Sequence, residues 1–216
     1  MSKAVACWAG RSFAFDPKAT AFVAIDMQRD FLAPDGPVGA EGSARLREAM
    51  PGVARATAAA RRAGLHVIHT REGYLPDGSD MNPMKKARGF SGRPGPYGPV
   101  LIRGSRGQDF FDGFEPRPGE AVFDKPGFSA FHGTTLLEHL RGHGITHLIL
   151  TGITTQCCVH STVRAAVDHG FYCLTVEDAC AAIERPWHDA AIALIASENH
   201  LFGWVCGVKD LEAALA

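Results

Sequence analysis

The sequence predicts an α/β protein with a three-layer, Rossmann-like open parallel sheet of about six strands and helices on both faces. Two observations support this prediction. Short apolar runs alternate along the chain with stretches that have helical apolar spacing, which is typical of strands joined by helices. In addition, 216 residues with 46% hydrophobic content are enough to bury one substantial core. We therefore expect residues 1–216 to form a single domain.

The first half of the chain supplies two strands and one helix. The apolar run Ala21–Ile25 predicts a buried strand. After a loop, residues 43–63 predict a helix that ends at Gly64, because glycine commonly terminates helices. The run Leu65–His69 predicts the next strand.

The second half repeats the alternation four times. The spacing of Val159, Val163, Ala166 and Val167 predicts a helix that packs back on the sheet. In chain order we expect a strand at 121–124, a helix at 134–141, a strand at 147–151, a helix at 159–169, a strand at 171–176, a helix at 186–197, a strand at 203–206 and a helix at 208–215.

Residues 71–120 interrupt this alternation. Glycine and proline occur throughout the segment, together with basic residues at Lys85, Lys86, Arg88, Arg93, Arg103 and Arg106. Long loops in compact domains are usually lids, binding loops or interface arms, so we expect one of these at 71–120. The basic residues also fit a solvated surface. A domain boundary is disfavoured, because neither half has enough strands to close a core.

Composition limits the classes of partner and the compartment. A net charge of −1 gives no reason to expect nucleic acid or an acidic membrane surface as a partner. The six cysteines show neither CxxC nor zinc-ribbon spacing, which favours a reducing, cytoplasmic location. No apolar run approaches the roughly 20 residues of a membrane span, and no signal-peptide pattern is present.

A cysteine pair, Cys157 and Cys158, follows the predicted strand that ends at Thr151 and begins the next helix. A helix N-terminus stabilises anions and lowers a thiol pKa, so we expect a thiolate nucleophile here. By helical phase Cys157 lies on the polar face with Ser161, whereas Cys158 points toward the sheltered crevice with Thr162. Two alternatives remain: both cysteines are buried structural residues, or they form a thiol redox switch.

Three chemically different residues follow three of the predicted strands: Asp26, Lys125 and Cys158. Ligands of open α/β sheets bind beyond the carboxyl ends of the strands, so we expect these side chains to meet. A carboxylate near a thiol can take its proton and later return it to a departing amine, and an ammonium between them holds both anions. Taken singly, Asp26 also fits a loop cap and Lys125 a surface charge.

Three motifs resemble those of the isochorismatase-like cysteine hydrolases: Asp26-Met-Gln28-Arg-Asp30-Phe31, Lys125-Pro-Gly-Phe-Ser129-Ala130-Phe131 and Gly152-Ile-Thr-Thr155-Gln-Cys-Cys158-Val159. Their order and spacing are kept from about residue 20 to 208. The resemblance implies that Asp26, Lys125 and Cys158 form a catalytic triad with Cys158 as nucleophile. It also implies a cis peptide bond at Ile153-Thr154, which would aim the backbone N–H groups of Thr154 and Cys158 at one point as an oxyanion hole.

Differences between this sequence and the motifs of particular family members indicate which reaction to expect. Nicotinamidases in this family carry an Asp-x-His metal motif that is absent between Phe31 and His69, so we expect neither a metal nor another cofactor. His139 and His143 are spaced i, i+4, but we expect Gly142 and Gly144 to disrupt the helix that would align them. Because the cysteine is retained, the resemblance favours amide hydrolysis over cleavage of a vinyl ether.

Softer matches, such as His69-Thr-Arg71-Glu72-Gly, resemble the biuret, triuret and ureidoacrylate amidohydrolases. We expect a small amide or ureido substrate, cleaved with release of ammonia through an acyl-cysteine intermediate. Phe128 stands where biuret-type relatives often carry a lysine, so biuret itself is disfavoured. The alternatives are an N-carbamoyl-amino-acid amidase of the carbamoylsarcosine type, the thiol redox switch, or a non-catalytic interaction protein.

Substrate contacts follow from the same reasoning. We expect Phe31 and Phe128 as apolar walls and Arg71 near a polar tail of the substrate. Gln28 is a further candidate, although it also fits a role in orienting the loop after the first strand. We expect Glu198 to accept hydrogen bonds from ureido N–H groups. The apolar helices and the long segment at 71–120 favour a homo-oligomer, a dimer or tetramer.

Overall fold

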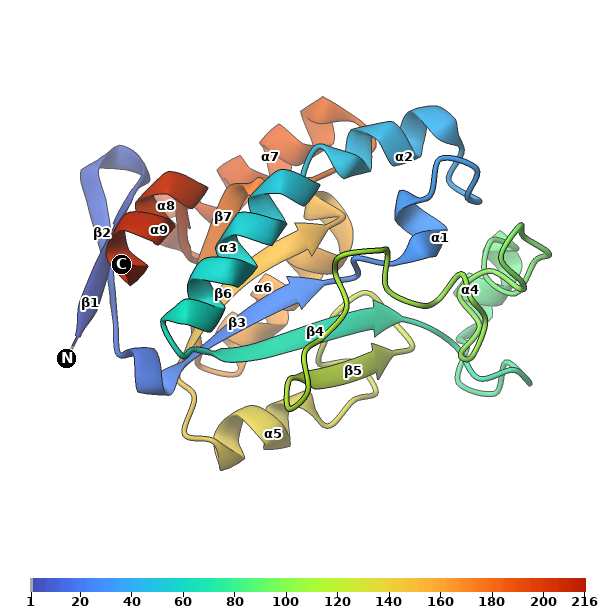
Figure 1. Cartoon of the computed structure of the whole chain (residues 1–216), viewed down its shortest axis with the longest axis horizontal. Coiled ribbons are helices and arrows are strands. Elements are labelled where there is room, and N and C mark those ends of the chain that lie inside the picture. Colours follow the sequence, from blue (N-terminus) through green and yellow to red (C-terminus); the bar gives the residue numbers. More distant parts are fainter. Residues whose placement is uncertain (1) are drawn as a thin grey trace.

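The computed structural model describes residues 2–216 and contains a six-stranded parallel sheet in the order β5-β4-β3-β6-β7-β8. All six strands lie where the sequence predicts them (Figure 1). Their bounds are β3 Thr20–Ile25, β4 His66–Glu72, β5 Ala121–Lys125, β6 His147–Ile153, β7 Tyr172–Ala181 and β8 Trp204–Cys206. The predicted α/β fold class is therefore confirmed.

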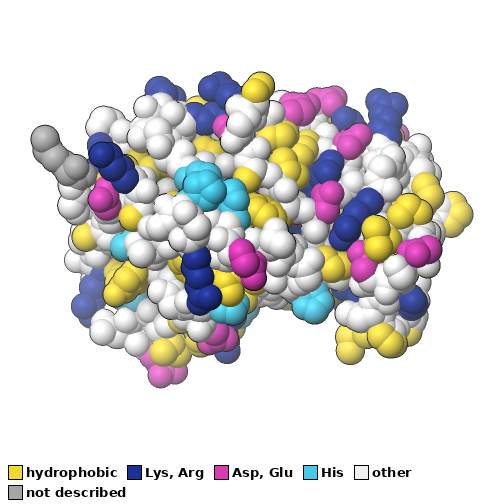
Figure 2. Space-filling view, turned by 90° about the horizontal axis from the view of Figure 1, so that it is seen from below, with side chains coloured by type: hydrophobic (Ala, Val, Ile, Leu, Met, Phe, Trp, Pro, Cys, Tyr) yellow, Lys and Arg dark blue, Asp and Glu magenta, His cyan; other side chains and the backbone are white. Residues whose placement is uncertain are grey.

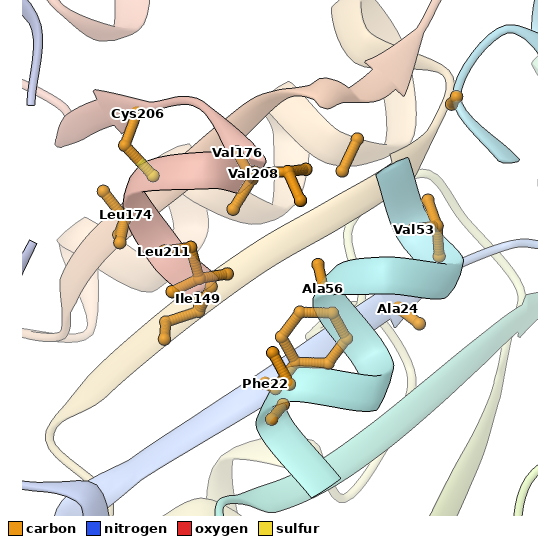
Figure 3. Close-up of a cluster of buried hydrophobic side chains, with 14 of the residues drawn as sticks. Phe22, Ala24, Val53, Ala56, Ile149, Leu174, Val176, Cys206, Val208 and Leu211 are labelled. Carbon is orange, nitrogen blue, oxygen red and sulfur yellow. The ribbon is translucent and has the colours of Figure 1, made fainter. Parts of the chain in front are cut away.

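Helices cover both faces of the sheet because successive strand residues point to opposite sides. In β3, Phe22 and Ala24 point to one face, where α3 (Met50–Arg62) and α9 (Val208–Leu215) supply residues such as Val53 and Leu211 (Figure 3). On the other face Val23 and its neighbours join a second core cluster. That face is covered by α5 (Leu136–Gly142), α6 (His160–Asp168) and α7 (Arg185–Ile195).

The predicted helix at 43–63 is two helices, α2 (Ala40–Arg47) and α3. The break falls at Glu48 and Ala49, just before Pro51 in the first turn of α3. Proline lacks a backbone N–H and clashes with the preceding turn, so it suits the start of a helix and not its interior. Pro51 therefore marks a boundary that apolar spacing alone does not show.

An antiparallel hairpin at the N-terminus was not predicted. It consists of β1 (Lys3–Cys7) and β2 (Arg11–Phe15), and it buries Val5, Phe13 and Phe15. These side chains join the core cluster that contains α3 and α9. The hairpin therefore extends one core of the molecule at the end where the chain termini lie (Figure 1).

The segment after β4 crosses the carboxyl ends of the strands (Figure 1). It contains one short helix, α4 (Pro83–Arg88), whose N-cap Asn82 accepts a hydrogen bond from the Lys85 N–H. Two further short helices are α1 (Arg29–Leu32), beside this segment, and α8 (Ser197–His200), after α7. Because β4 extends to Glu72, the irregular segment begins two residues later than predicted.

None of the helices in residues 2–216 is long and apolar enough to cross a membrane.

Candidate active site

Asp26, Lys125 and Cys158 meet at the carboxyl edge of the sheet. Asp26 directly follows β3, Lys125 is the last residue of β5, and Cys158 lies in the π-helical turn Thr155–Val159 that joins β6 to α6. The Lys125 Nζ atom lies 2.7 Å from Asp26 Oδ2 and 3.4 Å from Cys158 Sγ. Asp26 and Lys125 are fully buried, and Cys158 is 4% exposed. The sequence-based expectation that these groups converge is met.

The backbone holds Asp26 in an unusual conformation. Its φ angle is 54°, in the left-handed region that few non-glycine residues adopt. Two contacts with Thr70 of β4 fix it there: the Asp26 N–H donates to the Thr70 carbonyl over 3.1 Å, and the Thr70 hydroxyl donates to Asp26 Oδ1 over 2.7 Å. The carboxylate therefore points into the site and keeps Oδ2 for Lys125.

A close approach of two strands brings the nucleophile turn to Asp26. Gly152, near the end of β6, has a φ of 112°, and a Cβ atom there would lie 2.1 Å from the carbonyl oxygen of Ile25. Only glycine permits that contact. The peptide bond Ile153–Thr154 is cis, as the family resemblance implied. Thr154 and Cys158 both line the cavity described below.

Glu72 is a third charged residue in the site, beside Asp26 and Lys125, and no role for it was predicted from the sequence. The Cys158 thiol donates to Glu72 Oε2 over 3.7 Å, and the carboxylate also binds the Tyr74 hydroxyl at 2.8 Å and Lys85 Nζ at 2.6 Å. Glu72 is only 3% exposed. Glu72 was missed because the predicted strand ended at His69. In the structure β4 extends to residue 72, and alternation along the strand then places Glu72 on the same face as Thr70.

The buried charges shift one another's pKa values. Burial raises the pKa of Asp26 above its ordinary value, although Lys125 opposes this. Burial also raises the pKa of Glu72, but Lys125 and Lys85 outweigh it and lower the net value. For Lys125, burial lowers the pKa, and Asp26, Cys158 and Glu72 more than reverse the effect. Lys125 therefore stays an ammonium, and Glu72 stays anionic more readily than Asp26.

The expectation of a lowered thiol pKa at Cys158 is wrong. The hydrogen bond with Cys157 and burial raise the pKa of Cys158, and Lys125 only partly opposes them. The neighbouring carboxylates Asp26 and Glu72 add to the rise. The resting sulfur is therefore a thiol, which makes a nearby proton acceptor necessary before it can attack.

Cys157 also differs from expectation. Helical phase placed it on the water-facing side, but the residue is half-buried and lines the same cavity as Cys158. The reason is the local geometry: residues 155–159 form a π-helical turn, so the 3.6-residue period used for the sequence analysis does not hold there.

A cavity of about 460 Å³ opens onto the sulfur. Phe31 and Phe128 are among its walls, as expected. Glu72 at the end of β4 also borders it, and the segment after β4 contributes Lys85 and Arg88. Part of the predicted 71–120 segment thus borders the cavity. Small-molecule sites usually combine apolar walls with a few such polar groups.

Lys85 supplies the positive charge that the sequence analysis found missing at position 128. Its Nζ atom lies 3.6 Å from the centroid of the Phe128 ring, within the range of a cation–π contact. The same atom pairs with Glu72. A cation from α4 therefore lies over the aromatic residue at the position where the resemblance to biuret-type enzymes implied a lysine. The sequence alone does not predict the contact between Lys85 and Phe128, because 43 positions separate the two residues.

Three predicted substrate contacts lie outside this cavity. Gln28 is buried, with its amide bonded to the Glu72 backbone N–H at 2.7 Å and carbonyl at 2.9 Å, so it positions Glu72. Arg71 pairs with Asp124 on the neighbouring strand at 2.8 Å, because it points to the face of β4 opposite Glu72. Glu198 is exposed in α8, after α7 has run back toward the other edge of the sheet.

Asp26, Glu72 and Cys158 have ligand atoms within 4.8 Å of one another, a spacing that a metal ion can use. However, the Lys125 ammonium lies 2.7 Å from Asp26 and 3.4 Å from the sulfur. A metal ion among these three ligands would face this fixed positive charge at close range. The donor set therefore fits a protein cation better than a metal.

Comparison with known proteins identifies the family. The model of the isochorismatase domain matches residues 20–210. The chain belongs to the isochorismatase family. One relative within it is the ureidoacrylate amidohydrolase RutB of Methylobacterium radiotolerans, which is 32% identical over 94% of this chain and 81% of its own length.

Solved structures of hydrolases are similar as well. A cysteine hydrolase from Pseudomonas syringae superposes with a TM-score of 0.81 at 25% identity, covering 100% of this chain and 98% of its own. The N-carbamoylsarcosine amidase of Thermoplasma acidophilum superposes with a TM-score of 0.70 at 25% identity, covering 88% and 96% of the two chains. The family and these names support a hydrolase that acts on amide bonds.

Proposed function

We propose that the chain is a cysteine amidohydrolase that cleaves a C–N bond in a small ureido acid, such as ureidoacrylate. The observation that carries this proposal is the Cys158 thiol, which contacts the Lys125 ammonium and the Glu72 carboxylate and opens onto a cavity that Lys85 and Arg88 also border. The ureidoacrylate and N-carbamoylsarcosine hydrolases among the similar proteins act on molecules with a carbamoyl nitrogen and a carboxylate. The cavity offers the Glu72 carboxylate as an acceptor for the carbamoyl N–H groups, and Lys85 and Arg88 as cations for the substrate carboxylate.

In the proposed reaction Asp26 accepts the proton of the Cys158 thiol. Because its pKa is raised, Asp26 is a stronger base than an ordinary carboxylate, whereas Glu72 is held as an anion by two lysines. The sulfur attacks the ureido carbonyl carbon. The C–N bond breaks as Asp26 returns the proton to the leaving nitrogen, which departs as ammonia or an amine.

Water completes the reaction. It attacks the acyl-cysteine carbonyl, Asp26 takes a proton from the water, and the sulfur leaves and regains its proton. In both halves the negative oxygen of the tetrahedral intermediate faces the backbone N–H groups of Thr154 and Cys158. Each donor of such an oxyanion hole is typically worth about 3–4 kcal/mol in the transition state. The carbamate product decomposes to carbon dioxide and the nitrogen that it retains, which is ammonia if an amine left first and an amine if ammonia left first.

Glu72 takes the role in substrate recognition that the sequence analysis gave to Glu198. As a buried anion 3.7 Å from the sulfur, it can accept hydrogen bonds from the N–H groups beside the carbonyl under attack. Lys85 and Arg88 then meet the substrate carboxylate at the other end. Biuret and triuret lack a carboxylate, so we expect them to be poorer substrates.

The test is ammonia release from purified, reduced protein. Ureidoacrylate, N-carbamoyl-β-alanine, N-carbamoylsarcosine, biuret, triuret and nicotinamide are compared by kcat/KM. We expect the ureido acids to be cleaved fastest, and Cys158→Ser to lower kcat/KM by about 10³-fold or more. Cys7→Ser, in the N-terminal hairpin, is the matched control and should keep wild-type turnover. Equal turnover of Cys158→Ser and wild type would overturn the proposal.

Charge recognition is tested by two adjacent lysines. Lys85 faces Glu72 and Phe128, whereas Lys86 is exposed. We expect Lys85→Met to lower kcat/KM for a ureido acid by about 10–100-fold, the size of one buried charge-assisted contact, and to reduce the preference over the corresponding neutral amide. Lys86→Met should change neither value by more than about twofold. Equal effects of the two variants would contradict the role of Lys85.

Two alternatives have distinct outcomes in these assays. An N-carbamoyl-amino-acid amidase, suggested by the similarity to the Thermoplasma enzyme, would show its highest kcat/KM with N-carbamoylsarcosine. A thiol redox switch at Cys157 and Cys158 would show no hydrolysis in the reduced state and a structural response to mild oxidation.

A further inference from the structure

Three histidines form a cluster at the opposite edge of the sheet from the cavity. They are His66, the first residue of β4, and His139 and His143 from α5 and its C-terminus. A ligand nitrogen of each lies within 4.8 Å of those of the other two. Figure 2 views the molecule from the side on which α5 lies in Figure 1, and it shows a group of adjoining histidine side chains on this face.

We propose that His66, His139 and His143 bind a divalent transition-metal ion, Zn²⁺ or an ion of similar ligand preference. Three neutral imidazoles are a common ligand set for zinc, with water in the fourth position. His143 is exposed, so the fourth position opens to solvent. This site is separate from the residues assigned to hydrolysis and rests on different observations.

The two glycines beside these histidines do not prevent the arrangement, contrary to the expectation from sequence. Helix α5 runs through Gly142, and the His143 N–H donates to the His139 carbonyl over 3.2 Å. The left-handed Gly144, with φ of 66°, follows only after His143. The i, i+4 pair is therefore aligned on one side of α5, with ring centroids 4.3 Å apart.

Strand register supplies the third histidine. Ile68 of β4 belongs to the same core cluster as Leu136 and Leu140 of α5. His66 lies two residues before Ile68, so period-two alternation directs it to the same face. Its ring centroid lies 4.9 Å from that of His139 and 4.6 Å from that of His143. The sequence gives no sign of this contact, because residues 66 and 139 are far apart along the chain.

The hydrogen bonds prepare the nitrogens for a metal. His143 Nδ1 lies 2.8 Å from the His139 carbonyl and must donate to it, so the Nε2 lone pair of His143 is free. A carbonyl that accepts from the second ring nitrogen is the usual support of a metal-bound histidine. His66 Nε2 and His139 Nε2 lie 2.7 Å apart and share one proton between two lone pairs.

When a metal ion binds between these two Nε2 atoms, the ring that holds the shared proton changes to the tautomer protonated at Nδ1, which frees both Nε2 lone pairs. Zinc–nitrogen bonds of about 2.0–2.1 Å with tetrahedral geometry require ligand nitrogens roughly 3.3 Å apart, so the His66 and His139 rings need to separate by roughly 0.6 Å.

The test uses tag-free full-length protein freed of metal with a chelator. Zn²⁺ affinity is measured by calorimetry, and Co²⁺ is used as an optical probe of the ligands. We expect one Zn²⁺ per chain, a rise in melting temperature with Zn²⁺, and at least a tenfold loss of affinity in each of His66→Gln, His139→Gln and His143→Gln. His169→Gln, an exposed histidine outside the cluster, is the control and should bind within twofold of wild type.

A second arm separates this site from the cysteine site. Asp26, Glu72 and Cys158 can also attract a metal, but binding there would add thiolate charge-transfer absorption to the Co²⁺ spectrum and would be lost in Cys158→Ser. We expect Cys158→Ser to keep the affinity and the spectrum of wild type. The proposal is overturned if no metal binds, if binding follows Cys158, or if the exposed His143→Gln binds as wild type does. These outcomes do not depend on hydrolase activity.

Discussion

Glu72 and Asp26 compete for the proton of one thiol. The thiol donates to Glu72 over 3.7 Å, while Asp26 lies within 4.8 Å of the sulfur and has the raised pKa. The hydrogen bond from the thiol favours Glu72 as the proton acceptor. The pKa values favour Asp26, because its pKa is raised and that of Glu72 is lowered. We give more weight to the pKa values, because a carboxylate held anionic by two lysines is a weak base.

The pH dependence of Glu72→Gln distinguishes the two carboxylates. In the proposed mechanism hydrolysis needs Asp26 ionised, so we expect kcat/KM to fall as the pH drops through its raised pKa. Glu72 contributes to that rise; its removal should lower the pKa of Asp26 and shift the acid limb of the profile to lower pH. The measurement is kcat/KM between about pH 4 and 9. Loss of all turnover in Glu72→Gln, by about 10³-fold at every pH, would instead identify Glu72 as the base.

At the residue scale, the sequence predicted the side chains that meet at strand ends, and it missed those whose direction depends on alternation along a strand. Asp26, Lys125 and Cys158 all lie at or just beyond the carboxyl end of a strand, so sheet topology alone implied their meeting. Arg71 and Glu72 are neighbours on β4 and point to opposite faces. The predicted strand stopped at His69, and alternation was therefore not applied to them. The contact between Lys85 and Phe128 depends on the path of an irregular segment, which local patterns do not encode.

At the scale of elements, the packing of α3 on β7 depends on a glycine. A Cβ atom at Gly52 would lie 2.1 Å from the carbonyl oxygen of Asp178 and 2.8 Å from Ala179 Cα. Both are backbone atoms, so the helix itself must move to admit a methyl group. Gly142 in α5 meets nothing within 4 Å and has ordinary helical φ.

We expect Gly52→Ala to lower the free energy of unfolding by about 1–3 kcal/mol, the usual cost of overpacking. Gly142→Ala should leave it unchanged or raise it by up to about 1 kcal/mol, since alanine favours helices. Urea denaturation followed by circular dichroism measures both. An unchanged midpoint for Gly52→Ala would show that α3 is free to shift on the sheet.

Helices and strands with a strong apolar pattern were predicted from the sequence. Those whose burial depends on packing against a distant part of the chain were not. All six parallel strands were found because each is an apolar run between helical stretches. The hairpin of β1 and β2 has only short alternating runs, and the buried side of Phe13 and Phe15 is covered by the core around α9, from the other end of the chain. The split between α2 and α3 follows from Pro51, whose effect apolar spacing does not register.

At the scale of the molecule, the two ends of the sheet carry different chemistry. The carboxyl ends hold the thiol and its charges, and the amino end of β4 holds the histidine cluster. The single-domain organisation, the cytoplasmic location and the absence of nucleic-acid and membrane partners stay predictions. So does the homo-oligomer, for which several exposed apolar side chains give a physical reason.

Trp187 and Leu194 are each 51% exposed and lie seven residues apart on α7, so they share one side of the helix. Such a surface favours contact with a second copy of the chain. We expect light scattering after size-exclusion chromatography to give the mass of a dimer or tetramer, and Leu194→Glu to reduce it. A monomer at micromolar concentration would contradict the prediction.

The left-handed backbone of Asp26 decides how an inactive enzyme should be made for capturing its substrate. Asparagine enters that region several-fold more readily than most residues, and it keeps the shape of the side chain. Alanine has no such preference and removes the acceptor of the Thr70 hydroxyl. Asp26→Asn is therefore the variant in which an intact ureido acid can be soaked and its bound pose observed, with the turn after β3 undisturbed.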